Sequence, residues 1–238
     1  MEGPIAILFL ILPFMSLGQE ALDTELTGEK GALTYIGAYF TPGFAFRTLS
    51  NDFRDQTSED LIDFRNENET YKLGYTSGLT FGFNCNRNLG LETGMQYSNM
   101  GYQTKKVKLV SGDLIDPRRG FEYIGGDGAP SHVRIIDHFE YIGIPIALRY
   151  RMGNKKLKFS ASLGCIANYL VRASSSVVLY YDDDSPERSR QTSDTEYQDF
   201  NITLSIGAGI EYQLNPNMRI TAMPTLHYGA LDILDAPI

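Results

Sequence analysis

The chain has 238 residues and two cysteines, 42% of its residues are hydrophobic, and its formal net charge is -8. This acidic balance argues against nucleic acid as a partner. No segment beyond the N-terminus approaches the roughly 20 consecutive apolar residues that a membrane-spanning helix needs. Any crossing of a membrane therefore has to be made by strands.

The N-terminus carries one short apolar run at residues 5–14, followed by small residues at Ser16 and Gly18. Small residues at the -3 and -1 positions predict a signal peptide that is cleaved after Gly18. The n-region holds one acidic residue and no Lys or Arg, so a core strand in this run is the alternative. The predicted organisation is a signal peptide at 1–18, a linker at 19–30 and a barrel domain at 31–238.

Apolar and polar residues alternate along most of the remaining chain. The pattern is clearest from Phe200 to Tyr212, where even positions are apolar and odd positions are small or polar. A period of two predicts strands, and most of these are longer than the roughly 5–6 residues usual in soluble sheets. The seven predicted strands, in chain order, are 34–47, 71–84, 89–102, 140–151, 157–171, 197–212 and 218–228.

The connections alternate between short and long, as they do in outer-membrane barrels with periplasmic turns and external loops. Short turns rich in Asn, Gly or Pro are predicted at 84–88, 153–156 and 214–217. Long loops are predicted at 49–70, 103–137 and 172–196. The windows 51–70 and 181–200 each hold seven acidic and two basic residues, so the external loops carry the acidity.

Aromatic residues recur on the apolar face near both ends of the predicted strands. Ordinary β propensity explains any single tyrosine, but eight at matching depths indicate the two interfacial girdles of a membrane barrel. The girdle candidates are Tyr71, Phe83, Tyr97, Tyr150, Tyr169, Phe200, Tyr212 and Tyr228.

The opposite face carries charges of both signs among small residues. Opposite charges facing one lumen are expected to pair, because unpaired charges away from water are costly. An eight-stranded barrel is just wide enough to be filled by side chains, which argues against a diffusion pore. The lumenal ion-pair candidates are Lys72, Glu92, Arg149, Arg151, Lys158, Asp199, Glu211 and Arg219.

Two segments carry a family resemblance. Residues 141–150, Tyr-Ile-Gly-Ile-Pro-Ile-Ala-Leu-Arg-Tyr, resemble the Ile-Pro strand of the Bacteroidetes-type outer-membrane β-barrel family, the PorT-like relatives of the OmpA/OmpX barrels. Residues 207–212, Gly-Ala-Gly-Ile-Glu-Tyr, with the following Asn-Pro turn, are similar to the penultimate hairpin of that family. The resemblance runs from about residue 31 onward. It implies an eight-stranded antiparallel up-and-down barrel with a signal peptide, and PorT-like members are linked to protein secretion.

Only seven of the eight implied strands are visible in the alternation. The chain ends at Ile238, inside the expected last external loop, and an open sheet edge is not tolerated in lipid. The closing strand is therefore expected to be missing through truncation or a frameshift, or to be supplied by a partner.

Catalytic and metal-binding motifs are not found. The chain has three histidines and no Gly-x-Ser-x-Gly, His-Glu-x-x-His or phosphate-binding glycine loop. His138, and Ser131 beside His132, are the positions at which an embedded lipid-modifying enzyme could place a base and a nucleophile. We expect no enzyme activity, no cofactor and no metal.

The function predicted from sequence is that of a monomeric bacterial outer-membrane barrel acting as a structural, adhesive or envelope and secretion-assembly component. Expected partners are membrane lipids, lipopolysaccharide and a secretion-apparatus or extracellular protein held by the loops. The alternative is a soluble periplasmic lipocalin-like barrel with an apolar ligand inside. A lipid-modifying enzyme is the third hypothesis.

Overall fold

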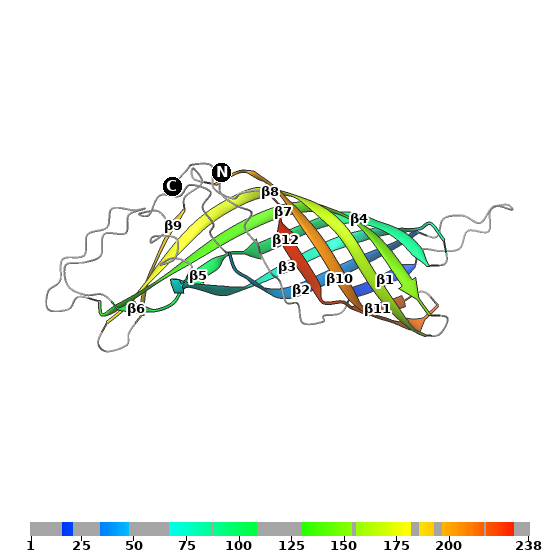
Figure 1. The fold of residues 1–238 in the computed structure, drawn as a ribbon, viewed down its shortest axis with the longest axis horizontal. Helices are drawn as coiled ribbons and strands as arrows, with labels where there is room; N and C mark the ends of the chain where they lie inside the picture. Colours follow the sequence, from blue (N-terminus) through cyan, green and yellow to red (C-terminus); the bar gives the residue numbers. More distant parts are fainter. Residues whose placement is uncertain are drawn as a thin grey trace.

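The structure is a computed structural model and is almost entirely antiparallel β-sheet (Figure 1). It describes residues 16–20, 34–47, 67–86, 88–108, 130–153, 156–181, 186–192, 197–216 and 218–230. Within these ranges, no helix has the length and apolar character to cross a membrane.

The described residues form twelve strands. Their bounds are β1 (Ser16–Glu20), β2 (Thr34–Ala45), β3 (Glu69–Asn84), β4 (Leu89–Met100), β5 (Tyr102–Thr104), β6 (Val107–Lys108), β7 (His132–Met152), β8 (Leu157–Tyr180), β9 (Pro186–Thr192), β10 (Phe200–Asn215), β11 (Met218–Ala222) and β12 (Thr225–Gly229).

The ladders follow an up-and-down order. β2 pairs with β3, β3 with β4, β4 with β7, β7 with β8, and β8 with β10. β10 then pairs with both β11 and β12, which divide one strand at Met223 and Pro224. β1 lies between β11 and β2, so the pairings lead back to the first long strand. The fold class predicted from sequence, an antiparallel outer-membrane β-barrel, is confirmed.

β1 was not among the predicted strands. It occupies the place expected for a missing closing strand, with Leu17 opposite Ile220 on one side and Ala38 on the other. The apolar run at 5–14 lies outside the described residues. The signal-peptide, linker and domain boundaries stay predictions.

β7 and β8 are longer than predicted. Residues 132–137 of β7 and 172–180 of β8 fall within segments predicted as long loops, and β9 pairs with β8 there from Ser174 to Tyr180. Val, Leu and Tyr residues at 177–180 favour a strand, but the neighbouring Asp run dominated the sequence pattern. In Figure 1 this extension, with β5, β6 and β9, lies at the end of the molecule opposite β11.

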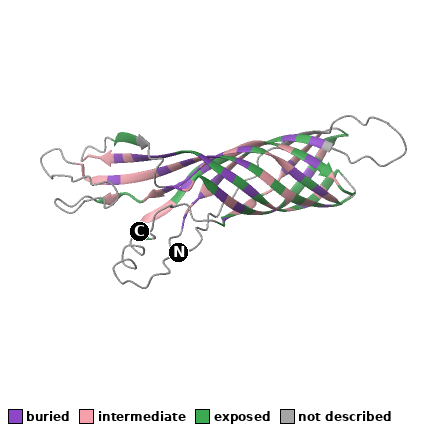
Figure 2. Ribbon diagram, turned by 90° about the horizontal axis from the view of Figure 1, so that it is seen from above, coloured by how far each residue is buried: buried purple, intermediate pink, exposed green. Residues whose placement is uncertain are grey.

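The two faces of the barrel wall have opposite character. Large apolar side chains are exposed on the outside, with Leu73 at 65% and Leu163 at 63% relative exposure. Polar side chains are buried inside, with Ser98 at 0% and Glu211 at 2%. Figure 2 shows this alternation as stripes of exposed and buried residues across the strands. An apolar exterior around a polar interior is the arrangement of a barrel that faces lipid.

The outer end of the barrel has an apolar core of its own. Phe139 packs against Tyr197 with a ring-centroid distance of 4.8 Å and against Tyr102 at 6.0 Å. Arg47 lies over the Tyr102 ring, 3.8 Å from its centroid, and forms an ion pair with Glu69. We call this group the outer aromatic core; its buried members are Ala45, Met100, Tyr102, Phe139, Tyr141, Leu170, Ala173 and Tyr197.

Candidate functional site

The lumen contains a cluster of five charged side chains contributed by four strands. Arg149 and Arg151 lie two positions apart on β7, so both point to the same face. The other members are Glu92 on β4, Glu211 on β10 and Arg219 on β11. We call these five residues the lumenal ion cluster.

Two glutamates connect the three arginines. Glu92 is 2.9 Å from Arg149 and 3.3 Å from Arg151, measured between carboxylate oxygen and guanidinium nitrogen. Glu211 is 3.3 Å from Arg149, 3.1 Å from Arg151 and 3.7 Å from Arg219. The Glu211 side chain is only 3% exposed. These are buried pairs, for which removing one partner is far more costly than at a surface.

Tyr35 on β2 joins the cluster to the opposite wall. Its hydroxyl donates to Glu92 and accepts a hydrogen bond from Arg151. Its ring lies beneath the Arg219 guanidinium, 3.8 Å from centroid to carbon. On the neighbouring strand, a Cβ at Gly82 would meet the Tyr35 ring at 2.0 Å. Gly82 therefore provides the space in which this tyrosine lies.

The structure places seven of the eight lumenal ion-pair candidates at three levels of the lumen. Glu92, Arg149, Arg151, Glu211 and Arg219 meet in the cluster. Lys158 lies opposite Glu211 in the β8–β10 register and lines the periplasmic mouth, but forms no ion pair within the described part of the chain. Lys72 is buried nearer the outer end, where its Nζ donates to Asn99 Oδ1 at 3.0 Å and the Met100 carbonyl at 3.1 Å.

The assignment of Asp199 to the lumen is wrong. Asp199 is exposed, and β10 begins only at the next residue. Its carbonyl accepts a hydrogen bond from the Leu170 amide at 2.7 Å. The carboxylate is therefore at the outer rim, where water solvates it, and the alternation that placed it inside had been extended beyond the strand.

The girdle candidates lie on the outward face. Seven are exposed and Tyr97 is half-buried. Phe83, Tyr150 and Tyr212 precede the short turns. Tyr71, Tyr97, Phe200 and Tyr228 lie toward the opposite end of their strands, and Tyr169 lies near the middle of the long β8. Tyr97 packs beside Tyr75, with ring centroids 6.1 Å apart.

A cavity of about 170 Å³ lies in the lumen beside the ion cluster. Arg149, Arg219 and Glu92 line it, together with Tyr39 and Thr221. Tyr39 donates to Gln96 Oε1 at 2.8 Å. The lumen is thus filled at the cluster and at the outer aromatic core, with space between them.

Sequence reasoning missed Tyr35, Tyr39 and Gln96 as lumenal polar residues. The signal for both tyrosines is the alternation within 34–47, where Tyr35 and Tyr39 fall on the face opposite to Ile36 and Phe40. Charge alone does not identify such residues, because hydroxyl and amide groups also form hydrogen bonds in the lumen. The outer aromatic core was missed because its members come from the ends of five different predicted strands and from Phe139 and Ala173 just beyond them, and alternation within one strand does not show which strand ends meet.

The positions considered for catalysis are only partly arranged. His132 Nδ1 is 3.2 Å from Ser131 Oγ, and Ser131 Oγ donates to the Tyr180 carbonyl at 3.2 Å. His138 lies farther along β7, opposite Ser174. Among the residues that the structure describes, no acid orients the His132 ring, and no three His, Cys, Asp or Glu side chains gather as a metal site.

Together, the lipid-facing exterior, the paired charges inside and the antiparallel order define an integral β-barrel of the bacterial outer membrane. A family model described as "Outer membrane protein beta-barrel domain" matches residues 29–228. The chain belongs to this family.

No curated protein matches the sequence. Among solved structures, the chain is similar to a major outer membrane protein from Thermus thermophilus, with 12% identity, a TM-score of 0.40, and 94% of this chain and 98% of that chain covered. It is also similar to the outer membrane protease OmpT from Escherichia coli, with 14% identity, a TM-score of 0.31 and 94% of each chain covered. Because both TM-scores are below 0.5, neither structure bears on the role of this chain.

Proposed function

We propose that the protein is a non-conducting outer-membrane barrel that acts as a structural, adhesive or assembly component through its external sheet. The observation that carries the proposal is the filling of the lumen at two levels. The lumenal ion cluster spans the barrel near its periplasmic end, and the outer aromatic core occupies the opposite end. An open path for ions would require both groups to separate.

The test is a planar-bilayer recording on the purified protein. We expect no steady large conductance from the wild type. The variant Glu211→Gln loosens the ion cluster alone, and we expect it to leave the membrane as silent as Glu140→Gln at the outer rim does, because the outer aromatic core still closes the lumen. A steady large conductance from the wild type would refute the proposal.

The outward role rests on the extension formed by β5, β6, β7, β8 and β9. Its strands are paired by backbone hydrogen bonds, so the extension forms a fixed surface to which a partner can bind. We place the lipopolysaccharide contact at its bases Lys105, Lys106, Lys108 and Arg134. Lys106 is held over the Tyr180 ring, 3.7 Å from its centroid, and Lys105 donates to the Glu67 carbonyl at 2.6 Å. Ammonium and guanidinium groups bind phosphate oxygens through charge-assisted hydrogen bonds.

One shortened variant distinguishes the two kinds of partner, an extracellular surface or a secretion apparatus such as the one linked to PorT-like proteins. Replacing residues 175–191 with an Asn-Gly turn removes the β8–β9 extension and leaves the membrane part of β8 intact. We expect this variant to reach the outer membrane with heat-modifiable gel mobility. Loss of adhesion alone identifies an adhesin, and loss of secreted proteins identifies an assembly component. Retention of both activities would refute a role for the extension.

The other two hypotheses have less support. A lipocalin-like barrel needs a wet exterior, but Leu73, Leu163 and Met95 are each more than 60% exposed. A lipid-modifying enzyme needs an oriented base, and the Ser131–His132 contact is a single neighbouring pair at 3.2 Å. A lipid-deacylation assay with His132→Ala as control tests the enzyme hypothesis, for which we expect no activity above background.

A further inference from the structure

Positive charge exceeds negative charge at the periplasmic end of the lumen. The lumenal ion cluster contains three arginines and two glutamates. Lys156 and Lys158 add two cations at the mouth, where Glu211 is the one acid among the described lining residues. Uncompensated charge in a low-dielectric interior is costly unless a counter-ion is present.

Two guanidinium nitrogens in the cluster have no partner within the described residues. They are Arg149 Nε and Arg219 Nη2, and both atoms are buried. Buried donors in native proteins are nearly always satisfied, by protein or by a bound molecule. Other atoms of both arginine side chains line the cavity of about 170 Å³, so a rotation of either guanidinium would bring its unpartnered N–H to a molecule held there.

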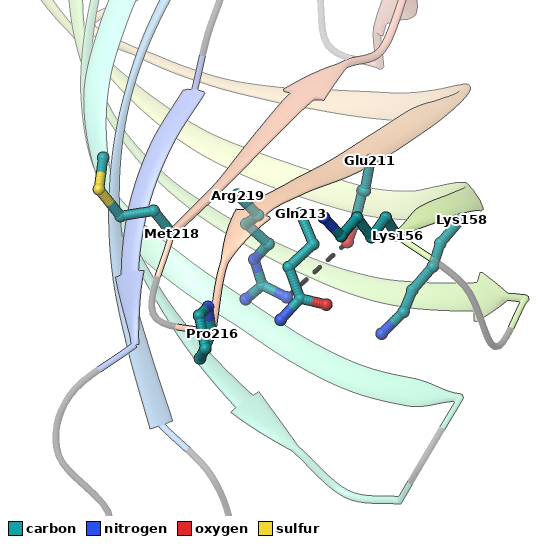
Figure 3. A pocket seen from close by; sticks show the side chains of 7 residues that line it. All are labelled: Lys156, Lys158, Glu211, Gln213, Pro216, Met218 and Arg219. Carbon is teal, nitrogen blue, oxygen red and sulfur yellow. Dashed lines mark ion pairs between the residues drawn. The ribbon is translucent and has the colours of Figure 1, made fainter.

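Cations also line the periplasmic mouth of the lumen. A small pocket at the mouth is lined by Lys156, Lys158 and Arg219, as Figure 3 shows. In this view Arg219 forms its ion pair with Glu211. Arg219 lines both the mouth and the inner cavity, and so lies between them. A cleft lined by cations raises the local concentration of anions.

We propose that the periplasmic half of the lumen binds a small oxyanion, a carboxylate or a phosphate, with Arg219 and Arg149 as its donors and Lys158 at the entrance. A guanidinium fork matches the geometry of either group. The cavity sets an upper size, because a cavity of roughly 150 Å³ accommodates a benzene-sized molecule. Its place inside the wall favours a free anion over a lipid headgroup, whose acyl chains would have to cross the lumen.

The proposal goes beyond the non-conducting role and is tested separately from it. Purified protein in a nonionic detergent is titrated calorimetrically with sodium phosphate and with sodium acetate at constant ionic strength, and the urea midpoint is measured at each anion concentration. We expect saturable one-site binding of at least one anion and a matching rise in the midpoint, because a ligand that binds only the folded state stabilises it.

Three variants locate the site. Arg219→Gln is expected to raise the dissociation constant about tenfold or more, since it removes a charge-assisted contact. Lys158→Gln, which breaks no ion pair of the described chain, is expected to raise it several-fold. Arg172→Gln, exposed on the external part of β8, is expected to leave it unchanged. If Arg219→Gln does not fold, Lys158→Gln decides the question.

The absence of both heat and midpoint shift with either anion would overturn the proposal. Binding that is unchanged in folded Arg219→Gln and Lys158→Gln would also overturn it, because the anion would then lie elsewhere. Binding to lipid vesicles containing phosphatidic acid, without binding of free phosphate, would replace the free anion with a headgroup and refute the lumenal site. Bilayer conductance plays no part in these outcomes, so failure here leaves the non-conducting role standing.

Discussion

Neutralising Glu211 is the most informative single change in this barrel. Glu211→Gln keeps the shape of the side chain but removes the charge that three arginines share at 3.1 to 3.7 Å. Arg149, Arg151 and Arg219 would then face Glu92 as their one carboxylate in the cluster. Breaking a buried pair by removing one partner costs about 3–5 kcal/mol.

The assay is urea unfolding of the protein reconstituted in lipid vesicles, followed by heat-modifiable gel mobility. With a urea dependence of about 1–3 kcal/mol per M, the predicted loss lowers the unfolding midpoint by at least about 1 M. The matched control is Glu140→Gln. Glu140 pairs with Arg190 at 3.6 Å, and the Arg190 side chain is 52% exposed, so this change is expected to cost about 1 kcal/mol or less.

A second substitution tests the cause. If uncompensated positive charge is the reason for the loss, Arg219→Gln added to Glu211→Gln should restore part of the stability rather than add to the damage. A Glu211→Gln midpoint within error of the Glu140→Gln midpoint would refute the reasoning. An additive loss in the double variant would assign the effect to packing instead of charge.

Three further predictions concern other parts of the molecule. Gly82→Ala is expected to lower the free energy of unfolding by about 1–3 kcal/mol, because the new Cβ meets the Tyr35 ring at 2.0 Å. The control is Gly90→Ala, where the nearest atom is 3.1 Å away. A Gly82→Ala cost no larger than the Gly90→Ala cost would contradict this packing. Leu163 lies on the lipid face near the middle of the membrane part of β8, and Val171 lies nearer the interface. Leu163→Arg is expected to lower the free energy of unfolding in vesicles by about 2–4 kcal/mol, and Val171→Arg by about 0–1 kcal/mol. Equal losses would contradict the membrane depth of these two residues. Burial, with Lys72 and Arg190 nearby, lowers the pKa of His138 in the external part of β7 to about 4 from its usual 6.5, so the unfolded chain binds more protons between these values and stability falls as the pH drops from 6.5 towards 4. His138→Gln should therefore lose less stability than the wild type between pH 7 and pH 5, and identical pH profiles in urea unfolding would disprove the contribution of His138.

The lipid-facing half of the fold was readable from sequence because lipid imposes a local rule. Leu163, Ile206 and Leu73 each alternate with small or polar neighbours, and the structure places all three outward. A period of two needs no knowledge of distant residues. The same rule predicts that the side chains of Arg149, Arg151 and Glu211 point into the lumen.

Which lumenal charges meet could not be read in this way. Contact between Arg151 and Glu211 depends on the register of β7, β8 and β10 around the barrel, and no single strand contains that information. Asp199 was misplaced because alternation alone does not mark where a strand ends. β1 was missed because Ser16–Glu20 is too short and too polar to show an alternation of its own, and the β8–β9 extension because the acidic run that follows β8 favours a loop.

The central claim is that the apolar face of the strands contacts lipid and the opposite face lines the lumen. The most direct test is site-directed spin labelling along β8 with the protein in lipid vesicles, in a background in which Cys85 is replaced by Ser and Cys165 is also replaced by Ser except where it is itself the labelled position. Labels on the outward face should collide frequently with oxygen and rarely with a water-soluble nickel complex; the exposed positions are Ala161, Leu163, Cys165 and Ala167. A label on the inward face, at Ser160 or Ser162, should collide rarely with oxygen. A period of two in oxygen accessibility is the predicted result. High nickel accessibility at Ala161, Leu163 and Cys165 would contradict the lipid-facing barrel.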